Sequence, residues 1–169
     1  SGNAALITPD RALARRVLAA LARWNVPVDD SGGDPLSETR AGIFARLAAE
    51  VALNGCEPVP LLALLRHPLC RFGGDEFSPL AAVSLLERAI LRGPRPRPGA
   101  TGLLQALQSL RISKKKLHRN DPRAALSDDD LDRATTLAEK LQAALEPLAS
   151  VKGSLLFRQF VSRHRDVVI

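Results

Sequence analysis

Leucine and alanine supply most of the apolar part of this sequence, and this restricts the chain to a mainly helical fold. Hydrophobic residues make up 46% of the 169 residues, yet tyrosine and methionine are absent and Trp24 is the only tryptophan. Leucine and alanine are strong helix formers, whereas strands prefer β-branched and aromatic residues. A compact chain of this length buries roughly 70% of the surface that its unfolded form exposes. We therefore expect helices packed on helices around a substantial core.

Helical periodicity is clearest after Pro35. Ile43, Leu47 and Val51 recur every four residues, and the Asn54-Gly55 pair that follows is typical of a helix C-terminus. A shorter apolar helix is expected at residues 60–66, and Ser78-Pro79 is expected to open another that ends at Gly93. These segments predict a run of short helices with tight connections.

The second half of the chain continues this pattern. Residues 94–99 read PRPRPG, which excludes a helix and predicts an extended connector. A further helix is expected to begin near Leu103. Ser127 is followed three residues later by Asp130, the spacing of a capping box, and this predicts a helix N-terminus. A final helix is expected from Ser154.

The first 36 residues have a different pattern. Residues 4–7 form a short apolar run typical of a buried strand, and residues 26–28 form a second one. The Thr-Pro-Asp sequence at 8–10 has the residue types favoured at a helix N-cap and first turn. Together these segments predict a short β-α-β unit, the building block of a parallel sheet.

The predicted organisation is therefore a β-α-β piece at residues 1–36 and a multi-helix domain at 37–169, with a basic, proline-rich linker near 93–99. Two strands make a poor sheet, so further strands are expected from elsewhere in a longer protein. The chain also begins without an initiator methionine and stops on apolar residues. We expect it to be a piece of a larger protein.

Positive charge is concentrated in one part of the sequence. The net charge is +6, yet residues 1–87 carry a net −2 and residues 120–169 a net −1. Residues 88–119 hold nine basic side chains and no acidic ones: Arg88, Arg92, Arg95, Arg97, Arg111, Lys114, Lys115, Lys116 and Arg119. Such a block attracts polyanions, and phosphate contacts dominate the affinity of proteins for nucleic acids. These nine residues are the predicted DNA-binding set, although a basic run is also often only a solvated surface.

Aromatic residues are missing from this basic stretch. Base stacking on aromatic side chains is the usual device for holding single strands, so it is not expected here. Any contact with DNA is therefore expected to involve the backbone, and to be weak and sensitive to salt.

Residues for catalysis or cofactor binding are not found in a recognisable arrangement. The phosphate-binding sequence G-x-x-x-x-G-K-[ST] is absent, so no ATP site is expected. The three histidines lie about fifty residues apart in sequence, which is not a ligand spacing. The acidic residues at 128–132 fit the first turn of a helix, where carboxylates complement the helix dipole. We expect no catalytic residue, metal or cofactor in this chain.

Two further observations concern cysteines and membranes. Cys56 and Cys70 are too few and too far apart for a zinc knuckle or a CxxC redox site, and buried thiols are the favoured interpretation. No apolar run approaches the ~20 residues needed to span a bilayer. We expect a cytoplasmic protein without membrane contact.

Several segments, taken in order, resemble the UvrD/RecB-type superfamily-one helicases. The sequence ALITPDRALARRV at 5–17 resembles the start of a block in their second RecA-like domain, where a strand leads into a helix. WNVPV at 24–28 is similar to the step into the next strand, and DDSGGDPL at 29–36 to the loop before the helical insert. PLLALLRHPL at 60–69 is similar to the "LLxLLxxPL" element of that insert. Within this group, residues 4–98 look most like AddB-type subunits of bacterial AddAB helicase–nucleases.

The resemblance implies a role in double-strand break repair. Complexes of this type unwind and resect broken DNA ends for homologous recombination. An AddB-type subunit has a helicase-like region that does not drive unwinding, helps to recognise a hotspot sequence, and carries a nuclease domain at its C-terminus. The implied partners are DNA, an AddA-like helicase subunit and the remainder of the parent chain. No nuclease motif of the PD-(D/E)xK type is present, because Glu139 and Lys140 are adjacent rather than one residue apart.

Two functions therefore remain open. The first is a non-catalytic, DNA-handling module of such a repair enzyme, which contacts the DNA backbone and the partner subunit during end resection. The second is a protein-interaction scaffold without direct DNA contact, in which the basic block only aids solubility. An independent enzyme is the least favoured interpretation.

Overall fold

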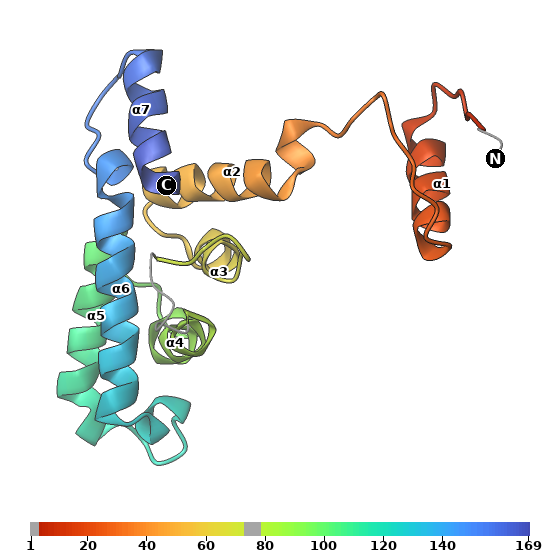
Figure 1. The fold of residues 1–169 in the computed structure, drawn as a ribbon. Helices are drawn as coiled ribbons and strands as arrows, with labels where there is room; N and C mark the ends of the chain where they lie inside the picture. The colour runs from red at the N-terminus through yellow and green to blue at the C-terminus, as the bar shows by residue number, and fades with distance from the viewer. Residues whose placement is uncertain (1–3, 73–78) are drawn as a thin grey trace. The chain divides into compact units, whose positions relative to one another are not determined.

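The computed structural model describes residues 4–72 and 79–169, and helices predominate in them (Figure 1). Helices account for 66% of the described residues, and none of these residues lies in a strand. The chain divides into two compact units, Ser1–Pro35 and Leu36–Ile169. We call them the N-terminal unit and the helical unit.

The predicted N-terminal β-α-β unit is wrong. Residues 4–7 and 26–28 are extended or irregular, and neither is assigned to a strand. The backbone amide of Val26 donates to the carbonyl of Leu21, at the end of the preceding helix. A strand needs a neighbouring backbone to pair with. These two segments flank a helix and do not pair with each other, so the apolar runs alone do not produce a sheet.

The helix of the N-terminal unit, α1, comprises Arg11–Arg23 and begins two residues later than the Thr-Pro-Asp sequence predicted. Asp10 is the N-cap, because its side chain accepts hydrogen bonds from the amides of Ala12 and Leu13. Arg11 then donates to both carboxylate oxygens of Asp30, at 3.1 and 2.9 Å, and to the carbonyl of Gly33 at 2.6 Å. These bonds hold the loop around residue 30 against the start of α1.

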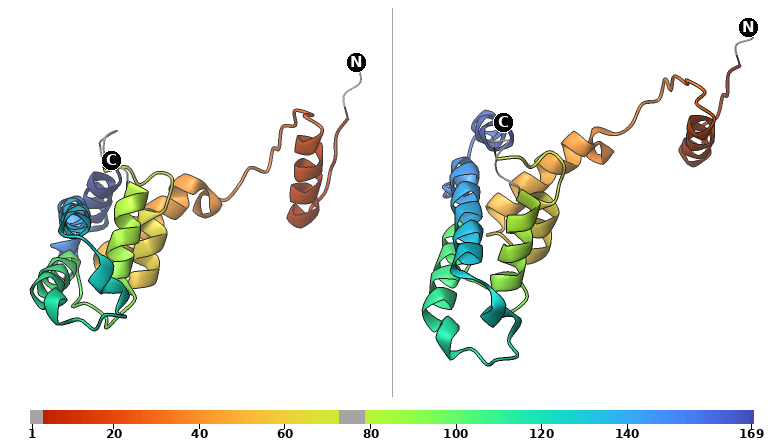
Figure 2. Two further views of the ribbon diagram at one scale, coloured as in Figure 1. Left: turned by 90° about the horizontal axis from the view of Figure 1, so that it is seen from below. Right: turned by 60° about the horizontal axis from the view of Figure 1, so that its bottom comes forward.

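The helical unit is built from short helices joined by tight connections. In chain order its elements are η1 Leu36–Glu38, α2 Arg40–Leu53, α3 Pro58–Leu65, α4 Pro79–Leu86, η2 Glu87–Leu91, α5 Ala100–Ser113, η3 Lys114–Lys116, η4 Pro122–Ala125, α6 Asp128–Ala149 and α7 Phe157–Val168. The longest helix, α6, is the centre of the unit and contacts α2, α4, α5 and α7. In the views of Figures 1 and 2, α5 lies alongside α6 and α3 lies alongside α4.

Local capping explains why these helices begin and end where they do. Thr39 caps α2, and the helix ends before Gly55, whose φ of +73° suits the C-terminal position predicted for it. The predicted capping box is confirmed, since Ser127 and Asp130 exchange hydrogen bonds of 3.0 and 2.8 Å. The last helix begins at Phe157 rather than at Ser154. Ser78 lies outside the described residues, and the helix expected to follow it begins at Pro79.

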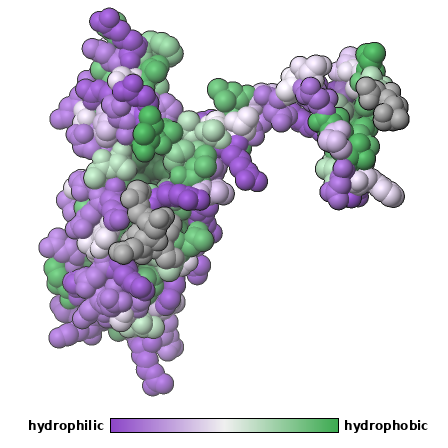
Figure 3. All heavy atoms as spheres, in the orientation of Figure 1, coloured by the Kyte–Doolittle hydropathy of each residue, from purple (hydrophilic) through white to green (hydrophobic). Residues whose placement is uncertain are grey.

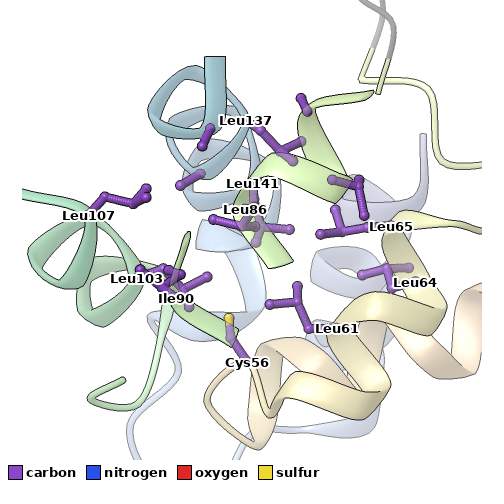
Figure 4. Close-up of a cluster of buried hydrophobic side chains, with 14 of the residues drawn as sticks. Cys56, Leu61, Leu64, Leu65, Leu86, Ile90, Leu103, Leu107, Leu137 and Leu141 are labelled. Carbon is purple, nitrogen blue, oxygen red and sulfur yellow. The ribbon is translucent and has the colours of Figure 1, made fainter. Parts of the chain in front are cut away.

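The core of the helical unit consists almost entirely of leucine, alanine and valine. Leu61 and Leu65 of α3, Leu86 of α4 and Leu137 of α6 are each no more than 1% exposed. Figure 4 shows these side chains converging with those of Leu103 and Leu107 of α5. At about 25 cal/mol per Å² of apolar surface removed from water, this burial is the main stabilising term of the unit.

The connection after α4 is held by an ion-pair network. The helix continues as a π-helical turn, η2, in which Glu87 is only 15% exposed at its side chain. Its carboxylate binds Arg66 at the end of α3 and Arg92 at the end of η2, the latter at 3.0 Å. The network ties the ends of two helices together and directs the chain into the proline-rich connector.

No helix in the described part of the chain combines the length and apolar character that crossing a bilayer requires.

Candidate nucleic-acid interface

The nine basic residues predicted to bind DNA do not form a single patch. Arg95 and Arg97 lie in the connector before α5, whereas Lys114, Lys115 and Lys116 lie in η3 after it (Figure 1). With a rise of about 1.5 Å per residue, the two ends of this helix are ~20 Å apart. The stretch that is continuous in sequence therefore has Arg97 beside the start of α5 and the three lysines beyond its end.

Among the residues that the structure describes, four of the nine are in ion pairs with carboxylates. The pairs are Arg92 with Glu87 at 3.0 Å, Arg95 with Glu57 at 2.7 Å, Lys114 with Asp128 at 3.3 Å, and Arg111 with Asp132. Glu87 directly precedes the basic stretch, whereas the other three acids come from more distant parts of the sequence. Their charges reduce the field that these four cations present to a polyanion.

Lys115, Lys116 and Arg119 form an exposed group that we call the basic tip. Within the described residues, none of the three takes part in an ion pair or a side-chain hydrogen bond. They lie in the segment that joins α5 to α6, shown at one end of the helical unit in Figure 1. This end of the unit has a hydrophilic surface in Figure 3.

Arg88 adds a further cation near this end. Its charge helps to lower the pKa of Asp130, after the larger effect of the hydrogen bonds from Ser127. Lys114 binds Asp128 in the same helical turn. Arg88 and Lys114 therefore approach the first turn of α6 from different elements. Arg97 is exposed at the opposite end of α5 and does not join this group.

The acidic residues at the start of α6 stabilise the N-terminus of this helix. Asp130 belongs to the capping box, and Asp128 and Asp129 fall in the first turn. In the regions that the structure describes, no group of three or more His, Cys, Asp or Glu side chains is arranged to hold a metal ion. The carboxylates thus have an electrostatic role in the helix and moderate the positive charge around it.

Arg123 is a candidate site residue that the sequence pattern did not indicate. Its Nε and Nη2 donate to both carboxylate oxygens of Asp121, at distances from 2.6 to 3.2 Å. These bonds lower the pKa of Asp121 to about 2. The charges of Arg123 and Asp121 cancel in a count of net charge along the sequence, so Arg123 does not stand out as part of a basic stretch. The Asp-Pro-Arg sequence at 121–123, with an N-cap residue before a proline, was the available indication of an ordered arginine.

Arg123 lines an open groove between the connector and α5. The cavity has a volume of about 250 Å³. Its walls include Gly93, Pro94 and Pro96 from the connector and Ala106, Ser109 and Leu110 from α5. Arg95 also lines it. The groove therefore combines apolar surfaces with the side chain of Arg123 and with Arg95, whose guanidinium pairs with Glu57.

The two cysteines are buried and unbonded, as expected. Cys56 is 6% and Cys70 9% exposed, and neither forms a disulfide. Burial raises the pKa of each thiol to about 11. At pH 8 only about one thousandth of each thiol is ionised, and the thiolate is the reactive form.

We therefore expect a thiol reagent at pH 8 to label neither cysteine of the folded chain on the timescale on which it labels both in denaturant. Timed labelling followed by intact-mass measurement checks this. Rapid modification of the native chain would show that one cysteine is exposed and ionised.

The comparisons with known proteins do not identify a relative: no protein-family model, no curated protein and no solved structure matches this chain.

Proposed function

We propose that this chain is a non-catalytic DNA-handling module that lies against the DNA backbone through the basic tip. The observation that carries the proposal is the group formed by Lys115, Lys116 and Arg119, exposed and without ion pairs among the described residues. Cations that a protein does not neutralise internally are available to replace the counterions of a phosphate chain.

The surrounding charge supports this proposal. Residues 87–123 hold ten basic and two acidic side chains. Four acids from other parts of the chain, Glu57, Asp128, Asp130 and Asp132, interact with them. Ten cations against six carboxylates leave a net +4, so the region stays positive after internal pairing. The absence of aromatic side chains from residues 88–119 favours backbone contact over base stacking.

The resemblance to AddB-type subunits adds the biological setting to this proposal. In that setting the module belongs to a helicase–nuclease subunit that acts in double-strand break repair, beside an AddA-like partner. The helical unit then contacts the DNA backbone during end resection, while unwinding and cleavage of the DNA take place elsewhere in the complex.

Neutralising the basic tip tests the proposal. The slope of log K against log salt is about −0.9 for each phosphate contact, so three contacts are worth roughly 500-fold in affinity at 0.1 M salt. A variant with Lys115→Gln, Lys116→Gln and Arg119→Gln is therefore expected to lose about this factor in duplex binding. Fluorescence anisotropy with a labelled duplex measures the change.

The matched control removes the same charge elsewhere in the helical unit. Arg46, Lys152 and Arg158 are exposed, and Lys152 and Arg158 follow the far end of α6, ~30 Å along that helix from its first turn. Their replacement by glutamine is expected to leave binding within a few-fold of the parent chain. Equal losses in the two variants would mean that net charge alone, rather than the basic tip, determines binding.

A second candidate function is a protein-interaction scaffold. The N-terminal unit favours it, because no side chain of α1 is buried and large apolar side chains on either side are exposed. Ile7 is 95% and Trp24 80% exposed. Surfaces of this kind are common at protein interfaces. If the chain is such a scaffold, the triple variant of the basic tip loses no more DNA binding than its control variant does. Trp24→Ala is then expected to weaken assembly with the partner subunit.

A further inference from the structure

The connector groove contains a guanidinium that is held in place on one side and available on the other. Arg123 uses Nε and Nη2 for Asp121, and its Nη1 forms no hydrogen bond among the described residues. Nη1 lies 3.8 Å from where a methyl group on Gly93 would stand, and Gly93 is part of the groove wall. The free edge of the guanidinium therefore faces the groove.

Pairing with Asp121 fixes this orientation. A guanidinium held through two nitrogen atoms does not lose side-chain freedom when its third nitrogen binds a ligand. The Arg123 hydrogen bonds keep the pKa of Asp121 at about 2, so the pair persists throughout the pH range of ordinary binding experiments. The Arg123 side chain is 34% exposed, which leaves it accessible from solvent.

The groove also offers other contacts to a ligand. Ser109 lines it, and its hydroxyl forms no hydrogen bond in the described part of the chain. Pro94 and Pro96 supply apolar surface beside these polar groups. A site with two donors beside flat apolar walls suits an anionic group attached to a compact organic body such as a sugar.

The position of η4 connects this groove to the basic tip. Residues of η4, to which Arg123 belongs, contact both η2 and η3. Arg123 thus lies between the segment of Arg88 and the segment of Lys115 and Lys116. The local net charge of +4 favours a phosphate, which carries charge at every link of a nucleic-acid chain, over an isolated carboxylate.

We propose that the connector groove is a binding site for a DNA backbone phosphate, with Nη1 of Arg123 and the hydroxyl of Ser109 as its donors. This inference rests on the proposed function, because it extends the path of the DNA from the basic tip toward α4. The deoxyribose of the same nucleotide lies against Pro94 and Pro96. No base is read at this site, so its contribution does not depend on sequence.

The test uses the 169-residue chain and a 16-base-pair duplex. Arg123→Gln is expected to reduce the magnitude of the slope of log K against log salt by about one and to weaken binding roughly eightfold at 0.1 M salt. Arg123→Lys keeps the charge but loses the two-nitrogen attachment to Asp121. We expect its salt slope to be nearly that of the parent chain. It also provides a second variant if Arg123→Gln does not fold, as judged by its thermal transition.

Arg165→Gln is the matched control. Arg165 is exposed and pairs with its neighbour Asp166 at 3.0 Å, so this variant also removes one arginine from a local ion pair. It lies on α7, away from the groove lining. Its salt slope is expected to equal that of the parent chain.

Backbone amide shifts during titration with the duplex locate the contact. Shifts at Gly93, Ser109 and Arg123 that are lost in Arg123→Gln support the phosphate site. Shifts confined to residues 114–119, with equal slopes for Arg123→Gln and Arg165→Gln, overturn this inference and leave the proposed function standing. Absence of any binding by the parent chain overturns both.

Discussion

Leu137→Ala is expected to lower the free energy of unfolding of the helical unit by about 3–5 kcal/mol, because it removes a fully buried side chain from the central helix. Leu137 is 0% exposed, and Figure 4 shows it near Leu141 and Leu86 in the core. The loss has two parts, the transfer free energy of the deleted carbons and the cavity that the surrounding helices cannot fully close. Urea unfolding followed by circular dichroism measures it.

Ile112→Ala provides the control for this substitution. Ile112 lies on α5, which packs against α6, but its side chain is 75% exposed. Its truncation is expected to change stability by no more than about 0.5 kcal/mol. Similar losses for Leu137→Ala and Ile112→Ala would show that α6 is not the centre of the core.

Gly102→Ala is expected to destabilise the helical unit by about 1–3 kcal/mol, although alanine is the better helix former. A Cβ at this position would lie 1.8 Å from the carbonyl oxygen of Arg97 and 2.5 Å from its carbon. The connector backbone would have to move away. It is held there, because the amide of Gly99 donates to the carbonyl of Gly55 at 2.7 Å.

Gly93→Ala is the matched comparison, since it adds the same methyl group at the other end of the same connector. The nearest heavy atom, Nη1 of Arg123, lies 3.8 Å away, an ordinary van der Waals distance. The denaturation midpoint of Gly93→Ala is expected to stay close to that of the parent chain. A Gly102→Ala variant more stable than the parent would mean that the connector does not approach α5 closely.

The helices of this chain could be predicted because their determinants are local. The four-residue spacing of Ile43, Leu47 and Val51 and the Ser127–Asp130 capping box act within a few residues of the backbone that they shape. The predicted strands failed for the opposite reason. Whether residues 4–7 and 26–28 pair depends on a neighbouring backbone, which the apolar runs themselves do not supply.

The candidate interface shows a similar division. Counting charges located the basic stretch, but the count treats all nine cations alike. Which of them are neutralised depends on acids that folding brings close, such as Glu57 beside Arg95 and Asp132 beside Arg111. Arg123 was missed because its partner, Asp121, is two residues away and cancels its charge in the same count.

The salt dependence of duplex binding by the unmodified chain tests most directly whether the basic tip meets a phosphate chain. The three backbone contacts of the basic tip contribute about −2.7 to the slope of log K against log salt, and the proposed contact of Arg123 contributes about −0.9. The affinity is therefore expected to fall roughly 150-fold between 50 and 200 mM salt, for duplexes of unrelated sequence alike. An affinity that stays constant over this range would contradict the account.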